Sequence, residues 1–183
     1  MKKLILLILF LLVLPALPSS SMDYGSPRIP PVVRSHYRNH WCFHASAQSL
    51  NYVPQCVSGN YAISLYQGSY CNCCGDMSQR VCCRGVEVSI ISAMCDKFFP
   101  GARLRLLRQA CDGINQNPYF PTMVMDWSMG HAYVAYHVYV WGNPEGGMWF
   151  AEVDAMCPSL GGYKEFRYEL GANADVLYGV AYP

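Results

Sequence analysis

Ten cysteines, all beyond residue 41 of this 183-residue chain, constrain its fold more than any other feature. Five of them fall between residues 71 and 83. Neighbouring cysteines rarely bridge each other, so these five must reach across to one another or to Cys56, Cys95 or Cys111, and the sequence does not fix which. In an exported chain this many cysteines form disulfides, so whether the chain is exported decides how its fold is held together.

The first 21 residues have the pattern of a secretory signal. Lys2 and Lys3 are followed by an apolar run over residues 4–14, then by Pro15 and small residues up to Ser21. This order of charged, apolar and small residues is typical of signal peptides. The run is too short and too interrupted by proline for a membrane span. A retained N-terminal anchor is the alternative, but we expect residues 1–21 to be removed and the protein to be secreted or periplasmic, with no membrane attachment.

The remaining chain, about 160 residues, is long enough for one domain with a hydrophobic core. Residues 22–35 contain three prolines and are expected to form an extended lead-in. Residues 36–183 then form a single domain, which we expect to be a monomer. Without Lys2 and Lys3, the 13 Lys and Arg against 12 Asp and Glu become 11 against 12, a net charge of −1. No basic run is present, so a nucleic-acid partner is not expected.

A helix is predicted to begin beside Cys42. Asn39 is a suitable N-cap, which places Cys42 in the first turn. Residues at helical spacing form one buried face, and a polar residue and a proline end the run: Phe43, Ala47 and Leu50, then Asn51 and Pro54. The free N–H groups and the positive dipole end of a helix favour an anion, so the position biases a thiol toward the nucleophilic thiolate.

The rest of the chain changes from helical to strand patterns. Helices are predicted around residues 61–66, over 86–98 and over 104–111. Strands are predicted over residues 120–127, 131–141, 148–154, 163–170 and 176–182, with a hairpin loop at 143–147. Helices first and antiparallel strands later indicate the α+β class.

Several segments carry a family resemblance through their order and spacing. They are Trp41-Cys42-Phe43-His44-Ala45-Ser46, Gln55-Cys56, Cys73-Cys74, Asp126-Trp127, Gly130-His131-Ala132-Tyr133-Val134 and Val153-Asp154. Together they resemble the papain-like cysteine proteases, most closely a short bacterial branch of secreted effector proteases with a Trp-Cys-Trp-Ala-Ala type signature. The resemblance runs from about residue 37 to the C-terminus.

The resemblance implies a papain-like fold, with the nucleophile helix in a helical N-terminal half, the base on an antiparallel sheet, and a cleft between them. It implies that Cys42 is the nucleophile, His131 the base and Asp154 the residue that orients the imidazole. Proteases of this kind hydrolyse peptide bonds of proteins or peptides through a thioester acyl-enzyme. The resemblance implies no cofactor and no metal. His137 lies on the same strand as His131, and we expect it to be structural.

The oxyanion site is where the sequence departs from this family. Relatives usually carry a Gln five or six residues before the Cys, where this chain has Tyr37 and His36. The backbone N–H of Cys42 can donate, and His36 is the candidate for the side-chain donor, with an ordinary surface His as the other interpretation. Losing one oxyanion donor commonly costs about 10²–10³ in rate.

The cysteine count leaves other functions open. If Cys42 is free, nine cysteines remain and at least one more is unpaired; if Cys42 is bridged, five disulfides close and no nucleophile exists. The second hypothesis is therefore a catalytically inactive, disulfide-rich papain-like module that binds or supports other molecules. A third is a zinc-stabilised domain, with ligands from Cys71, Cys74, Cys82 and Cys83, although disulfides are the more usual state in an exported chain.

Overall fold

The computed structural model describes residues 20–25, 28–36, 40–69, 71–75, 80–106, 121–143, 148–169 and 177–181. The predicted signal up to residue 19, the Asn39 cap, most of the predicted fourth helix and the loop at 144–147 lie outside these residues. Within them, no helix is both long enough and apolar enough to cross a membrane.

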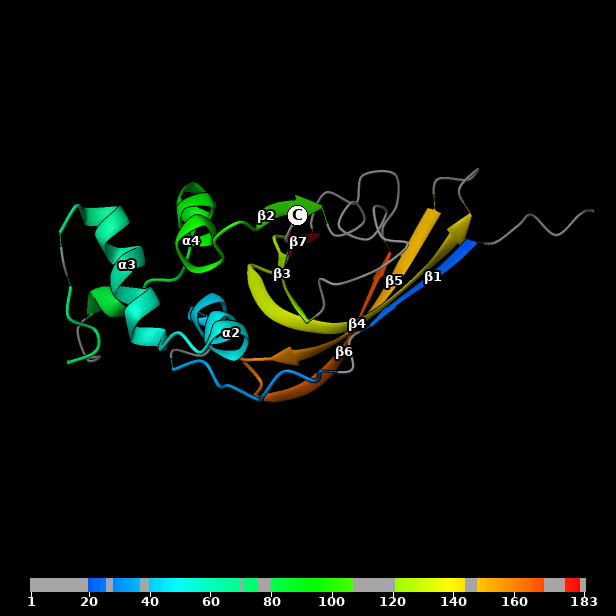
Figure 1. Ribbon diagram of the computed structural model, residues 1–183, viewed down its shortest axis with the longest axis horizontal. Coiled ribbons are helices and arrows are strands. Elements are labelled where there is room, and N and C mark those ends of the chain that lie inside the picture. The colour runs from blue at the N-terminus through cyan, green and yellow to red at the C-terminus, as the bar shows by residue number, and fades with distance from the viewer. Residues whose placement is uncertain are drawn as a thin grey trace, which may run out of the picture.

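Three helices gather at one end of the molecule, and the sheet extends away from them (Figure 1). They are α2 (Cys42–Asn51), α3 (Gln55–Gln67) and α4 (Ile91–Phe98), accompanied by the short 3-10 turns η1 (Arg80–Cys83) and η2 (Val88–Ile90). Helix α2 lies against strands β3 and β4, while α3 packs on α2 and α4. The N-terminal end of α2 is thereby placed against the sheet.

All strand pairs are antiparallel, in the order β2-β7-β3-β4-β5-β6. The strands are β1 (Ser20–Gly25), β2 (Arg103–Leu106), β3 (Thr122–Asp126), β4 (His131–Asn143), β5 (Met148–Cys157), β6 (Gly162–Glu169) and β7 (Leu177–Ala181). Strand β4 is the long central strand: its first half pairs with β3, and its second half, residues 137–142, pairs with β1. The predicted α+β class with an antiparallel sheet is confirmed, although strand β1 comes before the helices in the chain.

Three predicted elements are corrected. Residues 103–106 form a strand rather than a helix, because they pair with β7 at the edge of the sheet. The third helix begins at Ile91 after a 3-10 turn, not at residue 86. Strand β5 continues to Cys157, three residues beyond its predicted end at Asp154, because β6 stays paired with it to that point.

The main core lies between α2, α4 and the inner strands. Its members are buried apolar side chains, among them Phe43, Ala47, Met94, Phe99 and Met123. The rings of Phe43 and Phe99 meet edge to face with centroids 6.4 Å apart, an arrangement that aromatic pairs favour. Removing this surface from water is the dominant favourable contribution to holding α2 on the sheet.

Two disulfides hold the cysteine-rich segment to the helices. Cys56 on α3 is bonded to Cys74, and Cys73 is bonded to Cys82 in η1. The prediction that the clustered cysteines reach across to one another or to Cys56 is confirmed for these pairs. Cys42, Cys83, Cys95 and Cys157 are outside both disulfides.

Candidate active site

A buried tryptophan fixes the start of α2. Trp41 is the N-cap of the helix, makes no side-chain capping bond, and is 0% exposed. Its ring packs on Gly59 of α3, where an added Cβ would lie 2.9 Å from the indole, and meets the ring of His44 edge to face at 5.0 Å. Cys42 is therefore the first helical residue, and its position is set by the packing of its neighbour.

The Cys42 sulfur faces strand β4. The backbone N–H of Ala132 donates a hydrogen bond to Cys42 Sγ at 3.3 Å, and the side chain is 6% exposed. Burial raises the pKa of the Cys42 thiol, while the backbone N–H groups of Ala132, Phe43 and Cys42 itself act to lower it. The helix start thus favours the thiolate as expected, but the net shift is upward because desolvation is the larger effect.

His131 is the first residue of β4 and follows the tight turn of residues 127–130. Gly130 has φ +60°, a conformation that suits glycine. His131 Nε2 lies 3.4 Å from Cys157 Sγ, and Nδ1 lies 3.4 Å from Ser159 Oγ. Burial lowers the pKa of His131, and the nearby Asp126 carboxylate opposes this shift. No hydrogen bond joins His131 to Cys42 in the part of the chain that the structure describes.

Cys42 and His131 nevertheless line one pocket, of about 870 Å³. Its walls are mainly apolar and come from α2, from the segment after η1, from α4 and from β3: Phe43, Val86, Val88, Ile91, Met125 and Trp127. His40, Cys83 and the surface ion pair of Arg84 and Glu87, 2.9 Å apart, add polar groups to the lining. The structure thus brings together two of the residues that the sequence singled out.

Asp154 is not brought to His131. In the β4–β5 register it lies opposite His137, because the pairing runs without a shift from Asn143 and Met148 at the hairpin end to this pair. Its Oδ2 is 3.2 Å from His137 Nδ1, and Asp23 of β1 lies 2.5 Å from His137 Nε2. The assignment of Asp154 as the residue that orients His131 is therefore corrected: Asp154 and Asp23 hold His137, which ties β1, β4 and β5 together.

His36 also lies away from the pocket. Its side chain is exposed, its ring stacks on Trp41 with centroids 6.0 Å apart, and its backbone N–H donates to Gln55 Oε1 at 3.0 Å. Gln55 is 2% exposed and also donates to Arg34 O, so it holds the lead-in against α3. The structure does not support His36 as an oxyanion donor. His40, which sequence analysis did not assign, lines the pocket instead.

Near His131, Cys157 and Ser159 were not named by the sequence analysis, and Asp126 was named only in the segment Asp126-Trp127, with no role assigned to it. Cys157 and Ser159 lie at the end of β5 and in the turn after it, beyond the point where the strand was expected to stop. Asp126 is the last residue of β3 and the direct cross-strand partner of His131. An acidic residue five positions before a strand-initiating histidine was a signal that a β-turn would bring the two side by side.

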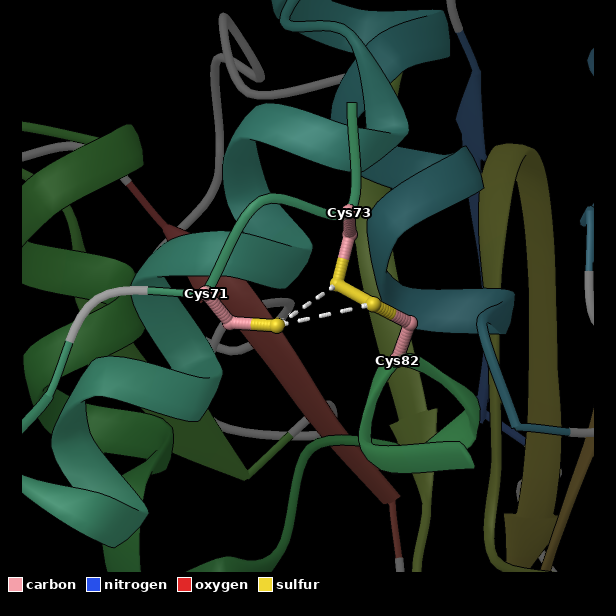
Figure 2. A group of neighbouring side chains, drawn as sticks. All are labelled: Cys71, Cys73 and Cys82. Carbon is pink, nitrogen blue, oxygen red and sulfur yellow. Dashed lines mark hydrogen bonds between the residues drawn. A yellow bond between two sulfur atoms is a disulfide. The ribbon is translucent and has the colours of Figure 1, made fainter. Parts of the chain in front are cut away.

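The cysteine-rich segment contains a group of three sulfurs with metal-like spacing. The sulfur atoms of Cys71, Cys73 and Cys82 lie within 4.8 Å of one another, and Figure 2 shows Cys71 facing the side of the Cys73–Cys82 disulfide, 3.7 Å from each sulfur. A bonded sulfur is not a thiolate ligand. Of the four cysteines in the zinc hypothesis, Cys74 and Cys82 are bonded in disulfides. This structure therefore favours disulfide cross-links over a zinc site in this segment.

Comparisons of this chain with models of protein families, with curated proteins and with solved structures find no match.

Proposed function

We propose that this chain is a cysteine peptidase of the papain-like type, which acts on protein or peptide substrates outside the reducing cytosol. One observation carries the proposal: a cysteine at the first residue of a helix and a histidine at the first residue of the central strand line the same pocket. A nucleophile and a base that share a cleft are the minimum set for acyl transfer through a covalent intermediate. The two disulfides support an extracellular or periplasmic location.

The chemistry follows from these two side chains. His131 takes the proton of the Cys42 thiol, and the sulfur attacks the carbonyl carbon of the scissile amide. The backbone N–H of Cys42 stabilises the resulting oxyanion. The imidazolium then protonates the leaving amine, which leaves a thioester, and a water deprotonated by His131 hydrolyses this thioester to the acid and the free thiol. Neither step requires a metal or an organic cofactor.

The raised pKa of Cys42 gives His131 its importance in this mechanism. Because burial disfavours an isolated thiolate, the anion must form as a pair with the imidazolium. In this structure His131 contacts Cys157 and Ser159 at 3.4 Å, distances typical of weak interactions with hydroxyl and sulfur groups. Catalytic hydrogen bonds are often long before substrate binds and tighten in the complex.

The pocket suits a peptide with an apolar side chain next to the scissile bond. Val86, Val88, Ile91 and Met125 are among its apolar lining residues. An extended peptide that placed such a side chain here would bury apolar area at about 25 cal/mol per Å². The binding energy would then hold the carbonyl carbon beside Cys42.

Cleavage of a peptide library tests this proposal. Purified, unreduced protein is incubated with peptides from a digested proteome, and new termini are identified by mass spectrometry. We expect cleavage after recurring sequence patterns with an apolar residue, lost in Cys42→Ser and reduced at least about 10³-fold in His131→Ala. Cys95→Ser, which changes a buried thiol outside the pocket, is the matched control and should retain activity. Cleavage that survives Cys42→Ser would contradict the proposal.

A second candidate function is a non-catalytic module on the same fold. The absence of a hydrogen bond between His131 and Cys42 in the described residues, together with the upward pKa shift of Cys42, favours it. Such a protein would use the apolar pocket to bind a segment without cleaving it. A library that yields no new termini, while the folded protein retains peptides in the pocket, would support this second function.

A further inference from the structure

We propose that Asp126 is the positioning residue for His131: it supplies the carboxylate that the sequence assigned to Asp154. This inference rests on the proposed function, since it concerns the base of the Cys42–His131 pair. It places the third member of the site before the histidine in the chain, on β3, rather than after it on β5.

The sheet register puts Asp126 and His131 side by side. They are direct partners in the β3–β4 pairing, where β3 ends and β4 begins. Side chains that lie directly opposite in an antiparallel pair project from the same face of the sheet and are close neighbours. The four-residue turn at 127–130 fixes this arrangement.

The Asp126 carboxylate is itself rigidly held. It is 0% exposed, and its Oδ1 accepts hydrogen bonds from Ser128 N at 2.9 Å, Ser128 Oγ at 2.5 Å and Met129 N at 3.1 Å. These three bonds fix the position of the carboxylate. Oδ2 has no hydrogen-bond partner among the described residues, although Tyr168 lies close enough to interact with the carboxylate. A carboxylate fixed in this position attracts the imidazolium and so opposes the downward shift that burial imposes on the pKa of His131.

The other ionisable groups near His131, among the described residues, are of two kinds. Cys157 and Tyr133 contact its ring, and Tyr133 is hydrogen-bonded to Tyr168. The remaining ones line the same pocket: His40, Cys42, Cys83, Arg84 and Glu87, of which Arg84 and Glu87 are paired with each other. Burial raises the pKa of Tyr133 and of Tyr168, and the Asp126 carboxylate adds to both shifts, so these phenols stay neutral. Among the described residues, Asp126 is the carboxylate whose charge acts on His131.

The role of Asp126 differs from that of the family's usual third residue. It makes no hydrogen bond to the imidazole, whose two nitrogens face Cys157 and Ser159. Asp126 therefore acts through its charge from a fixed position, while Cys157 and Ser159 hold the plane of the ring. Its effect is to keep the imidazolium, and with it the thiolate of Cys42, over a wider range of pH.

The pH dependence of Cys42 alkylation tests this inference. The rate of modification at Cys42 by iodoacetamide is followed by mass spectrometry between pH 4 and 10. In the wild-type protein we expect the plot of alkylation rate against pH to contain a high-pH transition, the upper limb, at which His131 loses its proton. Asp126→Asn keeps an acceptor for the turn but removes the charge. The midpoint of the upper limb should therefore fall by about 1 pH unit. Asp126→Glu, which restores the charge, should move it back toward the wild-type position.

Asp154→Asn is the matched control, because it removes a carboxylate from the same sheet at His137. The Asp154→Asn variant should leave the upper limb of the rate profile unchanged. An Asp126→Asn profile that coincides with that of the wild type would overturn the inference. A wild-type profile without any transition that depends on His131 would instead overturn the proposed function, so the two failures can be told apart.

A measurement on the wild-type protein covers the case in which Asp126→Asn does not fold. The carboxyl carbon of Asp126, observed by ¹³C NMR, should have the chemical shift of an ionised group at pH 7, and this shift should respond when His131 gains its proton. A neutral carboxyl group, or a signal insensitive to His131, would overturn the inference.

Discussion

At the scale of the residue, the site depends on groups whose charge is set by burial. Cys42, His131 and Asp126 lie at the junction of α2, β3 and β4, where Cys42 and Asp126 are buried and His131 is half-buried. A low local dielectric disfavours each charge alone and strengthens the attraction between opposite charges. Cys42 and His131 are therefore expected to become ionised together.

His44 provides a residue-scale prediction on stability. It is 0% exposed, its Nδ1 lies 2.9 Å from Ser58 Oγ, and burial lowers its pKa to about 3. The unfolded chain, with an ordinary pKa of 6.5, binds this proton more readily, so stability is present above about pH 6.5 and is lost as pH falls toward 3. His44 alone should lower the free energy of unfolding by about 2 kcal/mol from pH 7 to pH 5.

Urea unfolding of the disulfide-intact protein at the two pH values measures this loss. His44→Asn replaces the imidazole by an amide that does not titrate. The variant should be less stable than the wild type at pH 7 but lose about 2 kcal/mol less between pH 7 and pH 5. Equal losses in the two proteins would show that His44 is not a buried neutral imidazole.

At the scale of the element, the contact between α2 and α3 positions the nucleophile. Gly59 of α3 packs against the indole of Trp41, and an Ala Cβ there would come within 2.9 Å of two ring atoms. Helix propensity alone would favour Ala over Gly by about 1 kcal/mol. Overpacking typically costs about 1–3 kcal/mol, so the steric cost of the contact with Trp41 should outweigh the gain in helix propensity.

We therefore expect Gly59→Ala to destabilise the protein by about 1 kcal/mol or more and to slow alkylation of Cys42, because the displaced indole precedes that residue. Thermal unfolding and the alkylation rate measure the two effects. Val57→Ala on the same helix is the control, since Val57 is 45% exposed and Ala is the better helix former there. If Gly59→Ala stabilised the protein, Trp41 would not be held by this contact.

Elements defined by local pattern could be predicted from the sequence. The helix that carries Cys42 and the long strand from His131 followed from helical spacing and from a run of β-branched and aromatic residues. The helix begins later than predicted, because its N-cap is Trp41 and not Asn39. The segment at 103–106 was taken for a helix because its leucines fit that spacing. It is a strand because β7, more than 70 residues later, pairs with it, and such a distant partner leaves no trace in local periodicity.

The error at Asp154 has a different cause. The β4–β5 pairing runs without a shift from Asn143 opposite Met148 to His137 opposite Asp154, which places Asp154 six residues along β4 from His131. The bulge between Ala135 and His137 lies beyond this pair and does not affect it. Asp154 was also expected to end its strand, but β5 continues to Cys157. Asp126 was within reach of sequence reasoning, because only a four-residue turn separates it from His131.

At the scale of the whole molecule, the structure separates the candidate site from a second polar cluster. The pocket lies where the helices meet the start of β4, whereas His137 with Asp23 and Asp154 lies farther along β4, where β1 pairs with it. In Figure 1, β1 lies at the end of the sheet that is far from the helices. Six residues along a strand span about 20 Å. The His137 cluster therefore serves the attachment of β1, and it can be changed without touching the chemistry at Cys42.

The disulfides contribute to the same arrangement from the helical end. Cys73–Cys82 anchors η1, and the residues directly after η1 form a wall of the pocket. Gly85 approaches the backbone of His40 so closely that an added Cβ would lie 2.6 Å from its carbonyl oxygen. The Cys73–Cys82 disulfide and the contact between Gly85 and His40 hold the residues after η1 against the segment that carries Cys42.

Whether Cys42 and His131 form one activated pair can be measured by covalent labelling. The purified, unreduced protein is treated with a broad epoxide inhibitor of papain-like enzymes, and the modified residue is mapped by mass spectrometry. We expect modification at Cys42 alone among the thiols, lost in His131→Ala and retained in Asp154→Asn. If Cys42 is not labelled, or is labelled equally in His131→Ala, the two residues do not act as a pair.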